Sequence, residues 1–432
     1  MKIAVIGAGI SGLAAAWELA GRHERHEVHV FEAAPRAGGH AYTVEVEERG
    51  LRFPVDMGFI VYNERNYPGF CRLLDELGVE TAESSMGFSA SDPATGFEYS
   101  GENLSSLVAR RANLVEPRFW AIVAGAWRFW RAGTRELASA GSRRTLGDFV
   151  RASRLPRSFV DLYLRPMAGA IWSMPTAHVL DFPASTLLTF FRQHGLLDLM
   201  NRPAWRTLRG GARRYVEAVT ARLEAAGAEI HLAAPVQSIR RLDPGVEIRA
   251  AGESVRFDQV ILALHSDQAL AVLADPTPAE REVLGVIRYR ASDVVLHDDA
   301  SLLPRRRRAW SSWNVQIGEM EDIGITYLMN LLQPLPTATP WCVTLNRTAA
   351  IDPSRIRHRV SFAHPQLDMA AVAAQERWSE VSGPRGTHYC GAYWRYGFHE
   401  DGLWSGQRAA QAIVQAVAQA GTAAEAAATR AA

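Results

Sequence analysis

Hydrophobic residues at the start of the chain follow the pattern of a β-strand, a helix and a second β-strand. Residues 2–6 read KIAVI, a short apolar run typical of a parallel strand that is buried on both faces. A glycine-rich turn, GAGISG, separates this run from a predicted helix, LAAAWELA. The second predicted strand, EVHVFEA, ends close to the acidic residue Glu32. This order of elements predicts a Rossmann-like unit.

Three glycines of the turn, Gly7, Gly9 and Gly12, have the G-x-G-x-x-G spacing of dinucleotide-binding sites. The first glycine permits a tight turn, the second lets a pyrophosphate approach the backbone, and the third lets the helix pack close to the strand. Amide groups at the helix N-terminus favour bound phosphates. Glu32 follows at the distance expected of an acid that accepts hydrogen bonds from a ribose.

The remaining pattern alternates between helical and strand-like segments. Apolar positions with a 3.6-residue period dominate residues 76–204, whereas strand-like runs such as SDVVLHDD and CVTLNR fill residues 287–384. The predicted fold class is α/β, with a Rossmann-like nucleotide-binding domain interleaved with an α+β substrate domain. The nucleotide-binding domain takes residues 1–75, 205–286 and 385–418, the substrate domain takes residues 76–204 and 287–384, and an Ala-rich tail, 419–432, is expected to be disordered.

Composition indicates a globular protein without a strong charge bias. The chain has 432 residues, 48% of them hydrophobic, and a net charge of +1, which gives no support for nucleic-acid binding. Cys71, Cys342 and Cys390 are scattered, so they predict neither a disulfide framework nor a metal site. The start of the chain reads as a strand rather than a signal peptide, and no apolar run is long enough to span a bilayer. We therefore expect a cytoplasmic protein.

A second glycine-rich segment, APRAGGHAYT, follows the acid that is expected to bind ribose. The Arg36 guanidinium can pair with a pyrophosphate, and Gly38 and Gly39 let the backbone pass close to a flat ring. This arrangement resembles the flavin amine oxidase and phytoene desaturase superfamily, which carries an R-x-G-G element at this place. His40 stands where many members have arginine, so the contact with the reactive edge of the flavin differs in this chain.

The resemblance covers most of the chain and implies a GR2-type FAD-binding domain. FPVDMGFIVYN resembles the element whose D-x-G turn, here ending at Gly58, passes beneath the isoalloxazine ring. Members of the superfamily place a valine like Val236 at the adenine and end a strand near Ala263 beside the cofactor. Their C-terminal strand, loop and helix correspond to HYCGAYWRYGFHEDGLWSG, where Asp401 can cap the helix or reach the ribityl chain and Ala392 replaces the usual glutamate.

One FAD, held without a covalent bond, is expected, because no second glycine fingerprint is present and no cysteine has a place at the ring edge. The residues expected to bind FAD are Gly7, Gly9, Ile10, Ser11, Gly12, Glu32, Ala33, Arg36, Gly38, Gly39, His40, Gly58, Phe59, Val236, Ala263, Gly391, Asp401, Gly402 and Leu403. The candidates for proton transfer are four polar residues in segments that flank the ring, namely His40, Tyr62, Tyr396 and His399.

Amine oxidases of this superfamily typically use a lysine to hold a water at flavin N5, whereas Lys2 is the only lysine here and begins the first strand. The chain most resembles a bacterial subgroup of FAD-dependent oxidoreductases associated with fatty-acid-modifying methyltransferases. That resemblance implies desaturation or double-bond rearrangement of a fatty acyl chain, either free or phospholipid-bound, with a fatty-acid methyltransferase pathway as partner. Two alternatives stay open: an amine or carotenoid-like polyene oxidase, and a flavin-binding partner protein without turnover.

Two further segments bear on the membrane. One face of the helix predicted over residues 117–131 carries Trp120, Val123, Trp127 and Trp130. This face is either buried core or a surface that dips into a membrane and admits a lipid. The run Arg305 to Arg308 is either a solvated turn or a contact for phosphate headgroups or an acidic carrier. If the tryptophan face enters a membrane and the arginine run binds phosphate headgroups, the protein lies peripherally on the inner face of the membrane.

Overall fold

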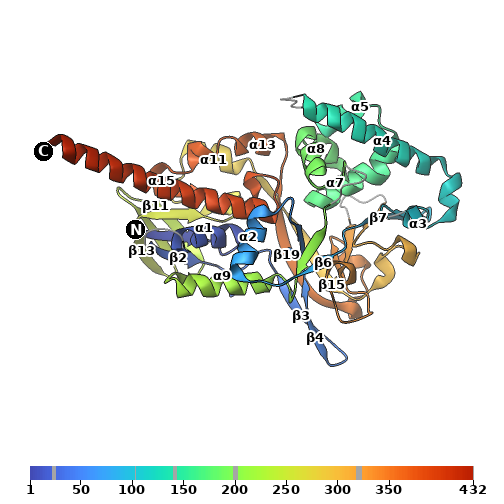
Figure 1. Ribbon diagram of the computed structural model, residues 1–432, viewed down its shortest axis with the longest axis horizontal. Helices are drawn as coiled ribbons and strands as arrows, with labels where there is room; N and C mark the ends of the chain where they lie inside the picture. The colour runs from blue at the N-terminus through green and yellow to red at the C-terminus, as the bar shows by residue number, and fades with distance from the viewer. Residues whose placement is uncertain (22–25, 103, 140–143, 198–202, 318–323, 432) are drawn as a thin grey trace.

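The computed structural model has two lobes, each assembled from segments that lie far apart in the sequence (Figure 1). It describes the chain apart from residues 22–25, 103, 140–143, 198–202, 318–323 and 432. The first lobe is built on a parallel sheet and contains the N-terminus and the C-terminal helix. The second lobe is built on a larger, mainly antiparallel sheet covered by helices. This arrangement confirms the predicted fold class.

The parallel sheet of the first lobe has five strands in the order β10-β2-β1-β14-β20. The strands are β1 (Lys2–Ile6), β2 (Glu27–Phe31), β10 (Glu229–His231), β14 (Gln259–Leu262) and β20 (Thr387–Tyr389). Every neighbouring pair is parallel. Because both faces are covered, alternate residues of β1 enter two different cores. Ile3 and Val5 pack among the helices of one face, and Ala4 and Ile6 pack on the other.

Helices cover one face of the parallel sheet, and a small sheet with further helices covers the other. The first face carries α1 (Ile10–Gly21), α2 (Pro68–Leu77), α9 (Arg213–Ala225) and α15 (His399–Ala431). The second face carries β11 (Val236–Arg241), β12 (Val246–Ala250), β13 (Glu253–Phe257), α10 (Ser266–Val272), α11 (Pro278–Gly285), α13 (Met369–Gln375) and α14 (Trp378–Val381). Since α13 and α14 pack here, the chain returns to the first lobe earlier than the boundary predicted at residue 384.

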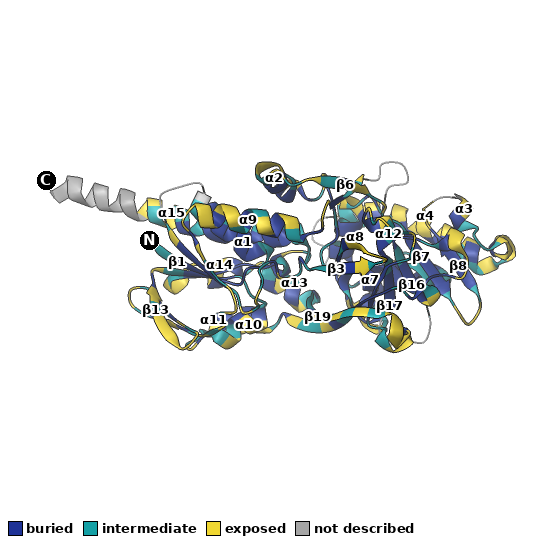
Figure 2. Ribbon diagram, turned by 90° about the horizontal axis from the view of Figure 1, so that it is seen from below, coloured by how far each residue is buried: buried dark blue, intermediate teal, exposed yellow. Residues whose placement is uncertain are grey.

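The second lobe is built on a seven-stranded sheet in the order β19-β15-β18-β17-β16-β7-β8, in which only the β16–β7 pair is parallel among the described residues. Its strands are β7 (Phe88–Asp92), β8 (Phe97–Ser100), β15 (Arg288–His297), β16 (Trp313–Gln316), β17 (Gly324–Leu328), β18 (Cys342–Leu345) and β19 (Ile356–Gln366). The helices include α3 (Leu104–Leu107), α4 (Pro117–Ala138), α5 (Leu146–Ala152), α7 (Arg165–Trp172), α8 (Ala184–Gln193) and α12 (Met329–Leu332). The central strands of both large sheets are buried, whereas β13, an edge strand of the small sheet β11-β12-β13, is largely exposed (Figure 2).

Smaller elements join the two lobes. A hairpin of β3 (Thr43–Glu48) and β4 (Leu51–Asp56) projects from the junction, beside a three-stranded sheet of β5 (Val61–Asn63), β9 (Trp205–Leu208) and β6 (Thr81–Ser84). Asp56 at the end of β4 is fully buried, and its carboxylate accepts the backbone N–H of Ala212 at 2.9 Å. The D-x-G segment is therefore anchored to the loop that opens α9.

The expected disordered tail differs from the structure, in which α15 continues to Ala431. The alanine-rich composition explains the difference, because alanine has the highest intrinsic helix propensity. Among the helices of the described ranges, none combines the length and the hydropathy that crossing a bilayer requires.

Candidate functional site

The dinucleotide turn between β1 and α1 has the backbone geometry that its three glycines allow. Gly7 has a positive φ of 103°, and its N–H donates to the Phe31 carbonyl at 2.7 Å. A Cβ on Gly12 would lie 1.8 Å from the Gly7 carbonyl oxygen, so only glycine lets α1 approach the turn. A Cβ on Gly9 would meet no atom within 4 Å. The space beside Gly9 is therefore open, as a pyrophosphate requires.

Glu32 lies directly beside this turn. Its Oε2 accepts the Ala8 N–H and its Oε1 accepts the Ala34 N–H, both at 2.8 Å. The Glu32 carbonyl accepts the N–H of Ala234, two residues before Val236, at 2.8 Å. Val236 thus lies close to the predicted ribose site, as an adenine contact requires. Ala33 is exposed beside the acid.

The R-x-G-G loop folds back onto the dinucleotide turn. The Gly38 N–H donates to the Ala8 carbonyl at 2.8 Å, and a Cβ on Gly39 would lie 3.2 Å from Cα of Gly9. The Arg36 guanidinium donates to the Gly39 carbonyl at 2.9 Å and lies 4.0 Å from the centre of the Tyr42 ring. Arg36 therefore stabilises its own loop, and its positive charge lies at the predicted pyrophosphate site.

The D-x-G turn packs against the backbone of His40. The Phe59 N–H donates to the His40 carbonyl at 2.9 Å, and a Cβ on Gly58 would lie 2.0 Å from the same oxygen. The two loops predicted to flank the flavin ring are thus in direct contact. Ala263 follows β14 and lies beside the dinucleotide turn, because its N–H donates to the Ile6 carbonyl at 2.8 Å.

A cluster of histidines that the sequence did not predict surrounds His40. The ring centre of His40 lies 5.4 Å from that of His364 and 6.3 Å from that of His265. Burial lowers the pKa of His40 to about 3, with a further contribution from His364, and burial lowers the pKa of His364 to about 4. These rings are neutral at neutral pH. The three residues come from three distant segments, so no local motif signals the cluster.

The C-terminal segment packs directly on the first turn of α1. A Cβ on Gly402 would lie 2.8 Å from Ile10 Cγ2 and 3.0 Å from Ser11 Oγ. The Gly391 N–H donates to Ser405 Oγ at 3.0 Å, and the side chain of Leu403 is buried in the core beneath. The last segment of the chain thus completes the dinucleotide site, as the resemblance implied.

Asp401 and Glu400 stabilise helix ends. α15 begins at His399, so Asp401 is the third residue of the helix and not, as the sequence predicted, the residue before it. Its Oδ2 accepts the N–H of Phe398 at 2.9 Å, and burial raises the pKa of Asp401 to about 7. The Glu400 carboxylate accepts the N–H groups of Gly69 and Phe70 at 2.8 and 2.9 Å, where α2 has no side-chain cap from Tyr67. Glu400 therefore has a structural role that the sequence did not indicate.

The four proton-transfer candidates lie in different surroundings. Tyr396 lines a cavity, and its carbonyl accepts the indole N–H of Trp172 at 3.1 Å. His399 stacks on Phe59 with ring centres 3.8 Å apart, and burial lowers its pKa to about 3. Tyr62 is buried in β5. The structure therefore does not bring the four candidates together around one point: Tyr396 lines the cavity, whereas Tyr62 and His399 pack among core side chains.

The cavity that Tyr396 lines has a volume of about 610 Å³ and opens between α8 and the C-terminal segment. Its charged lining residues are Arg65, Arg192, Arg395, Glu400 and Asp401. Phe398 and Trp394 form an apolar part of the wall, and Phe398 stacks on Phe190 with ring centres 4.7 Å apart. The cavity thus combines cationic groups with an aromatic surface, and it shares Asp401 with the residues predicted to bind FAD.

Open space at Gly9, the acid at the end of β2 and the Arg36 loop together fit FAD. Nδ1 of His364, next to His40, is buried and has no hydrogen-bond partner among the described residues, as expected beside a site for a polar ligand. The fold and these residues thus define a protein that binds FAD. Residues 10–296 match the family described as flavin containing amine oxidoreductase, which is more than half of the chain, so the protein belongs to this family.

A Mycobacterium tuberculosis protein (strain CDC 1551 / Oshkosh) named as a flavin-containing monoamine oxidase, AofH, is 28% identical over 289 residues. The match takes 64% of this chain and spans 59% of that relative's length. A structure named as a protoporphyrinogen oxidase from Exiguobacterium sp. 255-15 has a TM-score of 0.67 at 16% identity, covering 95% of this chain and 98% of the other. The CLA-producing fatty acid isomerase from P. acnes has a TM-score of 0.66 at 17% identity, covering 94% and 97%. These structures share the fold.

Proposed function

We propose that the protein desaturates an acyl chain, or rearranges its double bonds, and that this substrate carries an anionic group. The charge of the cavity carries the proposal. Arg65, Arg192 and Arg395 line it, whereas the Glu400 carboxylate is held by backbone amides and the pKa of Asp401 lies near neutrality. Such a lining favours a carboxylate or a phosphate and disfavours a protonated amine.

The position of the only lysine supports the proposal. Lys2 lies at the amino end of β1 and forms an ion pair with Glu27 at 2.9 Å. The cofactor site is at the carboxyl end of the same strand, roughly 16 Å away along five residues. Lys2 therefore cannot hold a water at the flavin ring.

An exposed tryptophan-rich surface of the second lobe also supports an acyl substrate. Trp120, Trp127 and Trp130 are 53%, 54% and 42% exposed, whereas Phe119 and Phe129 on the other face of α4 are buried. The structure thus excludes the buried-core interpretation of the tryptophan face. A row of exposed tryptophans beside arginines is typical of a helix that lies in a membrane interface.

Bound FAD supplies the hydride-accepting centre. The arginines would fix the anionic end of the substrate, and Phe398 and Trp394 would hold the adjoining chain and exclude water. Asp401 lines the cavity, and with a pKa of about 7 its carboxyl group can either accept or return a proton near neutral pH. For desaturation, a quinone or another carrier takes the electrons; for rearrangement, they return to the substrate.

Binding measurements with the FAD-loaded protein test the proposed substrate class. An unsaturated fatty acid, its methyl ester and a long-chain amine are compared in the wild type and in Arg192→Gln. We expect the acid to bind best and Arg192→Gln to weaken it by about tenfold or more, as for a lost charge-assisted hydrogen bond. Arg151→Gln, an exposed arginine of α5, is the matched control and should change nothing.

Preference for the amine, with no effect of Arg192→Gln, would contradict the proposal and favour the amine oxidase alternative. Tight binding of the acid without conversion or flavin reduction would favour a flavin-binding partner protein. Mass analysis of lipids extracted from the purified protein identifies the acyl chain directly.

A further inference from the structure

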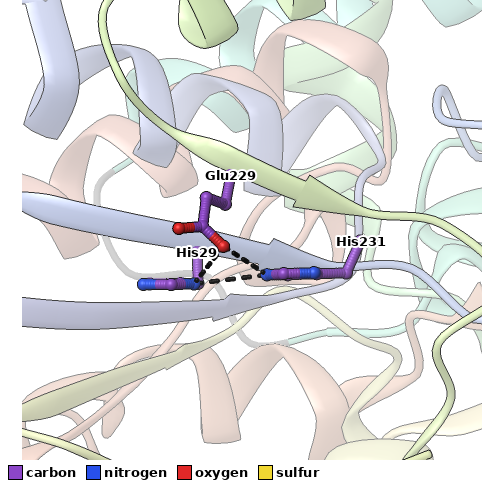
Figure 3. Close-up of side chains that lie close together, drawn as sticks. All are labelled: His29, Glu229 and His231. Carbon is purple, nitrogen blue, oxygen red and sulfur yellow. Dashed lines mark hydrogen bonds and ion pairs between the residues drawn. The ribbon is translucent and has the colours of Figure 1, made fainter.

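A second polar cluster lies at the edge of the parallel sheet, on the outermost strand β10 and its neighbour β2. His29 comes from β2, and Glu229 and His231 come from β10. In the parallel register Glu229 is the partner of His29, and His231 follows two residues later on the same strand face. The three side chains consequently converge, as Figure 3 shows. Glu229 and His231 are neighbours on β10, but His29 lies 202 residues before His231, so no spacing motif reveals the cluster.

The three potential ligand atoms form a nearly equilateral triangle. Nδ1 of His29 lies 3.2 Å from Nε2 of His231, and Oε2 of Glu229 lies 3.4 and 3.5 Å from these two nitrogens. In a tetrahedral site with metal–ligand bonds of about 2.1 Å, the ligand atoms are about 3.4 Å apart. The separations are therefore those that a tetrahedral metal ion requires.

The far nitrogen of His29 has the partner that a metal-binding histidine needs. Nε2 of His29 lies 2.8 Å from the Glu27 carboxylate, which also pairs with Lys2 at 2.9 Å. A proton held on Nε2 by Glu27 leaves the lone pair of Nδ1 directed at the cluster. Carboxylates orient ligating histidines in this way.

We propose that His29, Glu229 and His231 bind a divalent transition-metal ion, such as Zn²⁺, with a fourth position open to water. Two imidazoles and one carboxylate are a ligand set that zinc accepts. The Glu229 side chain is largely exposed and the His231 side chain is 35% exposed, so an ion can enter from solvent.

Binding requires a small rotation of the rings. The planes of the His29 and His231 rings make an angle of 3°, and the facing nitrogens of the two rings share a hydrogen bond. An ion would take the place of the shared proton, on the side where Glu229 lies (Figure 3). The ion would also hold β10 against β2 next to the cofactor, because the His231 carbonyl accepts the N–H of Glu32 at 2.9 Å.

Titration of the tag-free, FAD-loaded protein with ZnCl₂, and with CoCl₂ as a coloured substitute, tests the site. We expect one Zn²⁺ per chain and a Co²⁺ absorption spectrum of the tetrahedral type. His231→Gln and Glu229→Gln should weaken binding at least about tenfold, and Glu27→Gln about tenfold through its effect on His29. His178→Gln is the matched control, because His178 lies 3.7 Å from Asp181 on the surface of the other lobe.

Both edge residues are at least partly exposed, so their variants should keep FAD and the wild-type melting temperature without metal. Added Zn²⁺ should raise the melting temperature of the wild type and not that of His231→Gln, since the ion binds only the folded site. No stoichiometric Zn²⁺ binding by the wild type would overturn the proposal. Equal binding by the wild type, His231→Gln and Glu229→Gln would overturn it as well.

Discussion

Asp56 and Gln333 exchange two hydrogen bonds across the junction of the two lobes. The Asp56 N–H donates to Oε1 of Gln333 at 2.9 Å, and Nε2 of Gln333 donates to Oδ2 of Asp56 at 2.8 Å. Both residues are buried. Gln333 directly follows α12 of the second lobe, whereas Asp56 begins the D-x-G segment of the cofactor site. This pair therefore links the position of the second lobe to the loop beneath the predicted flavin.

Gln333→Ala should lower the free energy of unfolding by about 1–3 kcal/mol, because it removes the acceptor of the buried Asp56 N–H and one of the donors to the Asp56 carboxylate. Urea unfolding of the FAD-loaded protein measures this change. Gln415→Ala replaces an exposed glutamine of α15 and should stay within about 0.5 kcal/mol of the wild type. Equal stability of the two variants would show that the pair does not link the lobes.

Gly9→Val should abolish FAD binding while the protein still folds. The new side chain meets no protein atom close to its Cβ, so its clash is with the cofactor. Gly12→Ala is the contrasting variant, because its Cβ would collide with the Gly7 carbonyl and disturb the fold itself. Circular dichroism and flavin absorbance separate the two effects. Flavin should also leave the wild type on denaturation, and retention of yellow colour by denatured protein would contradict non-covalent binding.

The raised pKa of Asp401 predicts a pH dependence of stability. The pKa is about 7 in the folded protein against an ordinary value of 3.8, so the folded state holds a proton that the unfolded state loses. The contribution of Asp401 is present below pH 3.8 and is lost as the pH rises toward 7. Asp401→Asn keeps an acceptor for the Phe398 N–H and should reduce this decline. Identical slopes of unfolding free energy against pH in both proteins would refute the assignment.

Vesicle binding tests the exposed face of α4. Trp120→Ala combined with Trp127→Ala should reduce sedimentation with anionic vesicles, because these indoles are more than half exposed. Leu232→Ala, an exposed apolar residue of the first lobe, is the control. Wild-type protein that ignores vesicles at low salt would contradict the membrane interpretation.

We expect the run Arg305 to Arg308 to contribute less to binding of anionic vesicles than four free positive charges would. Arg306 pairs with Glu98 at 2.5 Å, and Arg307 lies 5.2 Å from the ring centre of Trp310. We therefore expect neutralisation of Arg305 and Arg308 to weaken vesicle binding by about 1 kcal/mol per charge, with a smaller effect at Arg306 and Arg307. A larger loss from Arg306→Gln than from Arg305→Gln would contradict this division.

The sequence predicted what depends on local geometry. The glycine turn and the acid at the end of β2 follow from spacing and backbone chemistry, and the structure brings them together, because Glu32 accepts the N–H of Ala8. Glycines such as Gly58 and Gly402 were found through the resemblance, and the structure explains them by close backbone contacts.

The sequence could not predict contacts that arise only when distant segments meet. The histidines around His40, the Glu400 carboxylate at the start of α2 and the Asp56–Gln333 pair each join residues far apart in the chain. In the tail, the alanine-rich composition was expected to give disorder, whereas the helix propensity of alanine extends α15. The sequence does not determine the exposure of the α4 tryptophans, because periodicity identifies a face but not what covers it.

Anaerobic mixing while flavin absorbance is followed tests the central claim most directly. The FAD-loaded protein is mixed in separate experiments with polyamines, aromatic amines and unsaturated acyl lipids. We expect no rapid bleaching by any amine, because no lysine is available at the ring, and either bleaching or lipid conversion without net reduction with an acyl lipid. Rapid bleaching by an amine, followed by peroxide when air is admitted, would contradict the account and identify an amine oxidase.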